Sequence, residues 1–402
     1  MKPRENRDQK RVVPILMSLL VAVAAPRANA EQWIPVEGRE TLQALVSGAT
    51  ARIDLGQGHS AVGHYAADGS ASIEAWGEVF QRSWRVEGEN QVCYSSAQET
   101  NCFSFERDAA NANRYRVRDT RDGEYTYFQL FAGQVAEASV AGDGSLGSPS
   151  AAEIAAELSN PNTAMGTLNL NLDYTAYQGD LPGAGGQESW RLLFQPSLPY
   201  PLDDTTNVFF RPAIPVVIEQ DVPAGIGEFD SVDWQLGDIG FDLALGKTLP
   251  GGYVVLGGVV GTLPTATDDL AGRDQWLLGP EVALAMTRPW GVVGVLLTHQ
   301  WDIAGEDDYD TNVTGGQYFY AFNLGGGWQI NGTPTFSYNH EARNGDNKLS
   351  FPLGIGVSRT LLLGGRPWKF GVQYWHYVAS PDDFGPDYQL RFNVSPVVAL
   401  PW

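Results

Sequence analysis

The last fifteen residues, 388–402, constrain the fold of this chain more than any other stretch. They read YQLRFNVSPVVALPW, and an apolar side chain occupies every second position from Leu390 to Trp402. The first polar residues between them are Gln389, Arg391, Asn393 and Ser395. A period of two indicates a half-buried strand, because successive side chains leave opposite faces of a sheet. A soluble β-sandwich and a membrane-spanning barrel can both contain such a strand.

A chain that ends on such a strand, with an aromatic residue last, is typical of transmembrane β-barrels. In these barrels the last strand pairs with the first, so that no sheet edge is left unpaired. We therefore expect Trp402 to be the terminal assembly signal, and we expect the barrel-assembly machinery and outer-membrane lipid to be partners of this chain.

Residues 1–30 have the order of parts of a secretory signal peptide. An apolar run over residues 12–25 follows a basic segment, and a cleavage motif, Ala28-Asn29-Ala30, comes next. The run is too short for a comfortable membrane helix, which argues against the alternative of an uncleaved anchor. We expect a mature chain that begins at Glu31 and resides in the outer membrane of a Gram-negative bacterium.

The charge of the mature chain excludes one class of partner. Without the six Lys/Arg and two Asp/Glu of residues 1–30, 20 basic and 45 acidic residues remain, a net charge of −25. Nucleic acid requires a basic surface, so we expect no nucleic-acid partner. No apolar run after residue 30 reaches the ~18 residues of a membrane helix.

Residues 31–140 have the pattern of a small periplasmic β-domain. Cys93 and Cys102 lie in adjacent predicted strands, and in an exported chain such a pair predicts a disulfide across a hairpin. The order Gly-x-Tyr, Asp-Gly, Trp-x-Val, Cys, Cys loosely resembles a small secreted β-domain of uncharacterised function. His64 is either a ligand or, as is more common for a single histidine, a structural residue.

Residues 141–163 predict a linker followed by a short helix. The linker reads GDGSLGSP over 142–149. Ser150 and Glu153 form a capping box, and Pro161 ends the helix. The helix is too short to be stable alone, so we expect it to pack as a plug or collar at the periplasmic mouth of the barrel. The alternative is a spacer helix between two folded units.

Residues 164–402 predict a barrel of about twelve antiparallel strands. The fold class is therefore all-β: a transmembrane barrel preceded by a short helix and a disulfide-bearing β-domain. Tryptophans near the expected strand ends fit interfacial girdles. The expected strands span 165–177, 187–199, 205–219, 232–248, 252–264, 275–287, 290–303, 314–329, 333–343, 347–362, 367–379 and 388–402.

Strand parity also predicts which polar side chains point into the barrel. These candidate lumen-lining residues are Arg191, Gln195, Arg211, Glu219, Asp238, Asp242, Glu281, Lys369, Gln373, Arg391 and Asn393. Mixed charges inside a barrel either form a lattice of ion pairs that closes the lumen or line a narrow path that selects solutes by charge.

An ordered set of motifs resembles an outer-membrane β-barrel family. The family is the one catalogued as "transporter" or "MetA-pathway of phenol degradation", and the resemblance implies a barrel linked to uptake of aromatic compounds. It covers the region from about residue 150 to the end and excludes the cysteine-bearing domain. The motifs are ELSNP (157–161), FRPAIPVV (210–217), LGDI (236–239), TLPTAT (262–267), QWLLGP (275–280) and FPLGIGV (351–357).

The sequence does not show the residue pattern of a membrane-embedded hydrolase. Such an enzyme needs a His–Ser pair on one strand face, but Ala342 follows His340 on its face and Trp301 follows His299. Asp238 and Asp242 share strand parity without a group that would orient them as an acid–base pair. We expect no enzyme, no catalytic residue, no cofactor and no metal.

The main functional hypothesis is an outer-membrane channel or transporter for a small solute, aromatic or hydrophobic in character. The alternative is a barrel that transports nothing and anchors the periplasmic N-terminal domain for binding. A third class, a soluble exported β-protein, would appear in the periplasmic fraction without detergent.

Overall fold

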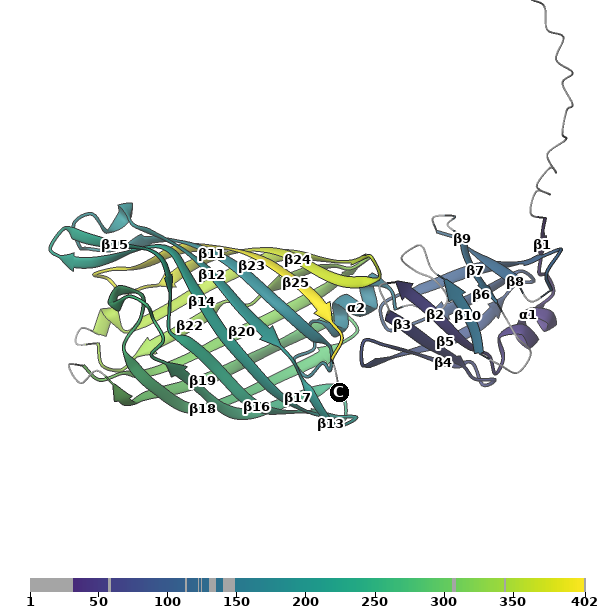
Figure 1. The fold of residues 1–402 in the computed structure, drawn as a ribbon, viewed down its shortest axis with the longest axis horizontal. Helices are drawn as coiled ribbons and strands as arrows, with labels where there is room; N and C mark the ends of the chain where they lie inside the picture. The colour runs from purple at the N-terminus through teal and green to yellow at the C-terminus, as the bar shows by residue number, and fades with distance from the viewer. Residues whose placement is uncertain are drawn as a thin grey trace, which may run out of the picture.

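The computed structural model describes residues 32–56, 59–112, 114–121, 123, 125–129, 135–139, 149–305, 309–342 and 345–400. The expected signal peptide, most of the linker and Trp402 lie outside these residues. The chain forms two β-units, and helix α2 (Ala151–Glu157) lies between them (Figure 1). No helix among the described residues is both long and apolar enough to cross a membrane.

The N-terminal unit is a sheet that closes on itself. Its strand order is β1-β7-β6-β5-β4-β3-β2-β10-β9-β8, and β7 also pairs with β8. Helix α1 (Arg39–Val46) packs on it and buries Leu42 and Val46. The strands are β1 (Trp33–Pro35), β2 (Thr50–Gly56), β3 (His59–Tyr65), β4 (Ser70–Ala75), β5 (Glu78–Glu87), β6 (Gln91–Ser95), β7 (Thr100–Asp108), β8 (Arg114–Asp119), β9 (Tyr125–Gln129) and β10 (Val135–Ser139).

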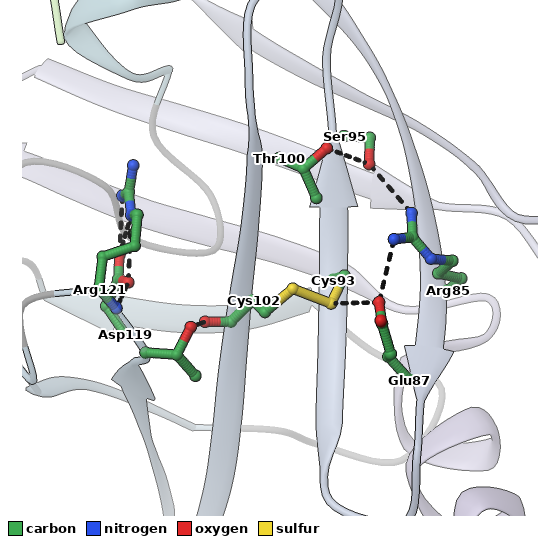
Figure 2. Close-up of a disulfide and its surroundings, with 9 residues drawn as sticks. Arg85, Glu87, Cys93, Ser95, Thr100, Cys102, Asp119 and Arg121 are labelled. Carbon is green, nitrogen blue, oxygen red and sulfur yellow. Dashed lines mark hydrogen bonds and ion pairs between the residues drawn. A yellow bond between two sulfur atoms is a disulfide. The ribbon is translucent and has the colours of Figure 1, made fainter. Parts of the chain in front are cut away.

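The predicted disulfide is confirmed. Cys93 on β6 and Cys102 on β7 are directly opposite in the antiparallel register and are bonded to each other (Figure 2). The neighbouring ion pair between Arg85 and Glu87 is exposed. The bond therefore joins the two strands of one hairpin inside the N-terminal unit.

The C-terminal unit is the predicted barrel of twelve antiparallel strands, and this prediction is confirmed. Strand β11 pairs with β12 on one side and with β25 on the other, and β12 pairs with β14, so that the ring is complete. The strands are β11 (Gly166–Gln178), β12 (Glu188–Ser197), β13 (Tyr200–Asp203), β14 (Thr206–Gly225), β15 (Glu228–Leu236), β16 (Ile239–Leu249), β17 (Tyr253–Leu263), β18 (Gln275–Arg288), β19 (Gly291–Gly305), β20 (Asn312–Gly325), β21 (Trp328–Gly332), β22 (Thr335–Asn339), β23 (Leu349–Leu363), β24 (Arg366–Ala379) and β25 (Gly385–Val398).

Two positions in the ring are occupied by interrupted strands. β15 and β16 both pair with β14 and are separated by Gly237 and Asp238; β21 and β22 both pair with β20 and are separated by Thr333 and Pro334. Short 3₁₀ turns lie in the connections between other strands. They are η1 (Ala184–Gly186), η2 (Asp269–Ala271) and η3 (Gly345–Asn347).

Several predicted strand boundaries were wrong. The strand expected over 205–219 extends to Gly225, and the strand expected over 232–248 begins at Glu228 and is interrupted after Leu236. We expected a strand over 314–329 and the next over 333–343, but β20 ends at Gly325 and β21 begins at Trp328. Gly325, Gly326 and Gly327 all have positive φ, which turns the chain sharply there. These three consecutive glycines in the sequence could have predicted the turn.

The outer surface of the barrel is apolar. Strand parity sends large apolar side chains outward from most strands, and exposed tryptophans lie near both strand ends, with Trp276 and Trp301 at the end away from α2 and Trp290 and Trp328 at the end near it. An apolar band flanked by aromatic residues is the exterior of a transmembrane barrel. The band includes Leu170, Phe210, Leu243, Val259, Val282, Leu284, Leu297, Leu353, Ile355, Val372 and Phe392.

The disulfide gives the first testable prediction. Replacing both Cys93 and Cys102 with Ser should lower the free energy of unfolding of the N-terminal unit by about 2–3 kcal/mol, because the bond closes a short loop in the unfolded chain. Denaturant unfolding followed by a probe in each unit measures this. The barrel transition should not move, and an equal shift of both transitions would contradict a role confined to the N-terminal unit.

Candidate functional site

The inner face of the barrel carries two separate clusters of ion pairs. In the first, the guanidinium of Arg391 donates to both oxygens of Asp173, over 2.7 and 2.8 Å, and Arg191 donates to the same carboxylate over 3.1 Å. Asp173 is almost fully buried. In the second cluster Arg211 donates to Asp242 over 2.8 Å, and its Nη2 lies 3.7 Å from Glu281.

Uncharged polar side chains continue the inner face on the same strands. Asn393 donates to Asn171 over 2.8 Å across β25 and β11. Gln373 on β24 accepts from the backbone N–H of Thr333 and from the indole of Trp375, each over 2.9 Å. These bonds fix the carboxamides and leave a polar wall on β24, β25, β11 and β12.

Two of the eleven candidate residues, Glu219 and Asp238, take no part in the ion pairs and carboxamide bonds of the inner face. Glu219 is exposed and lies beyond a bulge in the pairing of β14 with β12, where strand parity shifts. Asp238 sits in the break between β15 and β16, and its carboxylate accepts backbone N–H groups of Thr265, Ala266 and Arg273 over 3.1, 3.1 and 2.7 Å. Asp238 thus holds the loop between β17 and β18 against the barrel. Strand alternation mispredicts Glu219 because of the bulge and Asp238 because the strand is broken there.

A cavity of about 310 Å³ lies inside the barrel. Its polar side includes Gln195, Lys369, Gln373, Arg391 and Asn393, and Arg211 also reaches it. Its other side is apolar and comes mainly from β17, β18, β19 and β20. The apolar residues are Phe209, Leu256, Ala283, Val292, Leu296, Phe319 and Ala321.

Sequence reasoning missed this apolar inner wall. Strand β17 reads YVVLGGVVGTL, so both of its faces are apolar and alternation cannot separate inside from outside. The sequence analysis also did not identify Asp173 as an inward-facing residue. Asn169, Asn171 and Asp173 alternate with leucines in β11, and this pattern could have predicted it.

The chain between α2 and the first barrel strand forms the floor of the cavity. Residues 158–161 and Thr163 line it, and Asn162 donates to the carbonyl of Thr205 and the hydroxyl of Thr248, both over 2.9 Å. Gln329 donates to the carbonyl of Ala155 over 3.0 Å. Hydrogen bonds therefore fasten this segment to several strands of the barrel, and it does not lie free between the two units.

The predicted capping box begins helix α2 and is confirmed. The Ser150 hydroxyl accepts from the backbone of Glu153 over 3.2 Å, and the Glu153 carboxylate accepts from the backbone of Ser150 over 2.8 Å. The same carboxylate forms a buried ion pair with Arg82 of β5, whose Nε donates over 2.7 Å. The N-terminal unit is thus joined to the plug by a charge pair.

The two units also share one apolar core. The buried cluster of the N-terminal unit includes Ile154 of α2, Met165 just before β11 and Val397 near the end of β25. Burying apolar surface on both sides of the contact holds the units together without depending on the ion pair. Figure 1 shows α2 at this junction.

A pair of carboxyl groups, those of Glu78 and Glu157, also lies at the junction. Glu78 of β5 accepts the backbone N–H of Ala164 and, over 3.4 Å, the hydroxyl of Thr163. Glu157 accepts from Asn160 over 3.0 Å. Burial, and then the neighbouring charge of Glu78, raise the pKa of Glu157 to about 8, and burial also raises the pKa of Glu78. Protonation of one member relieves the repulsion between them.

The structure brings His299 and His340 together at the outer end of the barrel. The hydroxyl of Thr314 lies 2.8 Å from Nδ1 of His299 and 2.9 Å from Nε2 of His340. His299 shares strand parity with the exposed Leu297 and Trp301, so this cluster faces outward, away from the cavity.

One group of side chains has the spacing of metal ligands, and a disulfide occupies it. Among the described residues, the group with suitable spacing is Glu87, Cys93 and Cys102, but its two cysteines are bonded to each other. His64 is exposed, and its Nδ1 lies 3.3 Å from the hydroxyl of Thr50.

Comparisons with known proteins give matches in structure. No family model matches the sequence, and no curated protein matches it. An outer membrane channel from Pseudomonas putida F1 matches at 12% identity and a TM-score of 0.46, over 58% of this chain and 94% of that one. The NanC porin matches at 11% identity and a TM-score of 0.37, over 57% and 98% of the two chains.

The buried ion pair predicts how the plug is held. Arg82→Met leaves Glu153 buried without its partner, which should cost about 3–5 kcal/mol and loosen α2. Amide hydrogen exchange of residues 151–157 should accelerate at least tenfold. Arg85→Met, which breaks an exposed pair in the same strand, is the matched control and should change nothing. Unchanged exchange in Arg82→Met would show that the apolar core alone holds the helix.

The carboxyl pair predicts a pH dependence. Since the pKa of Glu157 is about 8 in the docked state against an ordinary value of 4.5, docking binds a proton. Docking should be strongest below about pH 4.5 and weaken as the pH rises through 8. Exchange of residues 151–157 should therefore be faster at pH 8.5 than at pH 5, after correction for the intrinsic rate.

Glu157→Gln should abolish that difference, because glutamine is neutral at both pH values. The exposed Glu74 provides the matched control, and Glu74→Gln should keep the full pH response. A pH response that survives in Glu157→Gln would assign it to another group.

Proposed function

We propose that this chain is an outer-membrane channel for small solutes, closed on the periplasmic side by the segment from α2 to Thr163. The observation that carries the proposal is the cavity of about 310 Å³ whose floor is that segment. A barrel whose only task is anchoring has no need of a ligand-sized cavity above a hydrogen-bonded floor.

The exterior supports residence in the outer membrane. The apolar band and its flanking tryptophans match the chemistry that lipid imposes on the outside of a barrel. Outer-membrane lipid and the assembly machinery that closes the barrel are the partners that this proposal implies, and export by residues 1–30 is part of it.

The solute proposed is small and partly apolar. The wall formed by Leu256, Val292, Leu296 and Phe319 gives an apolar contact, which is unusual for the interior of a membrane barrel. An aromatic or otherwise apolar body fits such a wall, in agreement with the resemblance to the family associated with phenol degradation.

The ion pairs of the lumen contribute shape and selectivity. Asp173 with its two arginines holds β25, β11 and β12 together, and Arg211 with its two carboxylates joins β14, β16 and β18. They narrow the path around the cavity and set the local charge that a passing solute meets.

The alternative function, anchoring of the N-terminal unit, has one specific observation in its favour. The shared apolar core and the Arg82–Glu153 pair fix that unit firmly on the barrel mouth. In the proposed channel the same contacts hold the plug closed, so the two functions differ in whether the barrel conducts when the plug is loosened.

Planar-bilayer conductance tests the proposal. Removing residues 150–158, or combining Asn162→Ala with Gln329→Ala, should raise the single-channel conductance of the barrel, because both changes release the floor of the cavity. Asn347→Ala removes two hydrogen bonds with Asp383 in the loops at the other end of the barrel and serves as the control, which should match the parent. Folded barrels that remain silent in all variants would favour the anchor.

A further inference from the structure

The cavity contains one cation that differs from the others. Arg391 and Arg191 share the carboxylate of Asp173, and Arg211 pairs with Asp242. Lys369 instead donates to the hydroxyl of Ser159 over 3.3 Å. In the described part of the chain, no carboxylate oxygen lies within 4.0 Å of its Nζ.

Lys369 stands where a bound molecule could reach it. It lies on β24 near the floor of the cavity and is one of the residues that line the space. An ammonium group partly withdrawn from water and lacking a counter-charge gains most from an anion that enters beside it.

The polar and apolar walls of the cavity lie on opposite sides of the barrel. The ring has twelve strand positions, so a strand faces the one six positions away: β24 faces β17, β25 faces β18, β11 faces β19 and β12 faces β20. Lys369 and the carboxamides are therefore across the cavity from Leu256, Ala283, Leu296 and Phe319. A molecule that fills the space contacts both walls at once.

We propose that this cavity binds a small organic monocarboxylate, with its carboxylate at Lys369 and its apolar body against the wall of β17 to β20. The inference rests on the proposed function, since it names the substrate class of that cavity. The volume of 310 Å³ is about twice that of a cavity that admits benzene, which leaves room for a ring and its acidic group.

The charge of the site selects a monoanion. A single unpaired ammonium matches one negative charge, and neighbouring carboxamides such as those of Asn393 and Gln195 can donate further hydrogen bonds. A phosphate ester carries nearly two charges and would require a further free cation. A neutral molecule of the same shape would keep the apolar contact and lose the charged one.

Isothermal titration of the full-length chain in detergent with benzoate tests the inference, and benzamide is the uncharged probe of the same shape. The parent should bind benzoate more tightly than benzamide. Lys369→Met should weaken benzoate binding by on the order of tenfold or more and leave benzamide binding unchanged, the size expected for a charged hydrogen bond. Lys369→Arg should retain most of the affinity.

Lys247→Met is the matched control, because Lys247 is exposed and lies outside the residues that line the cavity. It removes one positive charge and should bind benzoate as the parent does. Heat-modifiable gel mobility of each variant verifies that the barrel is folded.

Three results would overturn the inference: equal binding of benzoate by the parent and Lys369→Met, equal binding of benzoate and benzamide by the parent, or no binding of benzoate by the folded parent.

Conductance is measured separately and tests a different claim, the channel function. If benzoate binding depends on Lys369 but the barrel never conducts, the proposed site stands and the proposed channel function is wrong. If the barrel conducts but benzoate binding does not depend on Lys369, the channel function stands and the proposed site is wrong.

Discussion

The pairing of β11 with β25 is the interaction on which the rest of the molecule depends. Lipid offers no hydrogen bonds to a backbone, so a sheet in a membrane must leave no edge. The register from Gly166 opposite Val398 to Gln178 opposite Gly385 joins the first and last barrel strands along their full length. Once the ring is closed, each strand has one face toward lipid and one toward a limited interior space.

That interior space is divided unevenly, and the division gives the cavity its chemistry. Four neighbouring strands contribute carboxamides and cations, and the four strands opposite contribute apolar side chains. The ion pairs around Asp173 and Arg211 neutralise most of the charge and hold the wall rigid. What remains is a small amphipathic chamber whose floor is the chain that leads into the barrel.

Much of the barrel could be predicted from the sequence because lipid imposes a strict alternation. In β12 and β25 polar and apolar residues largely alternate, parity predicts Gln195 and Arg391 on the inside, and both line the cavity. Alternation failed where strands are irregular, as at Glu219 and Asp238, and where both faces are apolar, as in β17. The docking of the N-terminal unit could not be predicted, because Arg82 and Glu153 are 71 positions apart and neither carries a local signal for the other.

The shared core at the junction has a consequence for the order of events in biogenesis. Met165 enters the core from just before the first barrel strand, and Val397 enters it from near the end of the last one. These two residues become neighbours only when the ring closes, so the N-terminal unit receives its complete packing surface at that moment. A barrel whose last strand has not yet paired lacks the contribution of Val397 to this core, so the contact between the two units is complete only in the closed barrel.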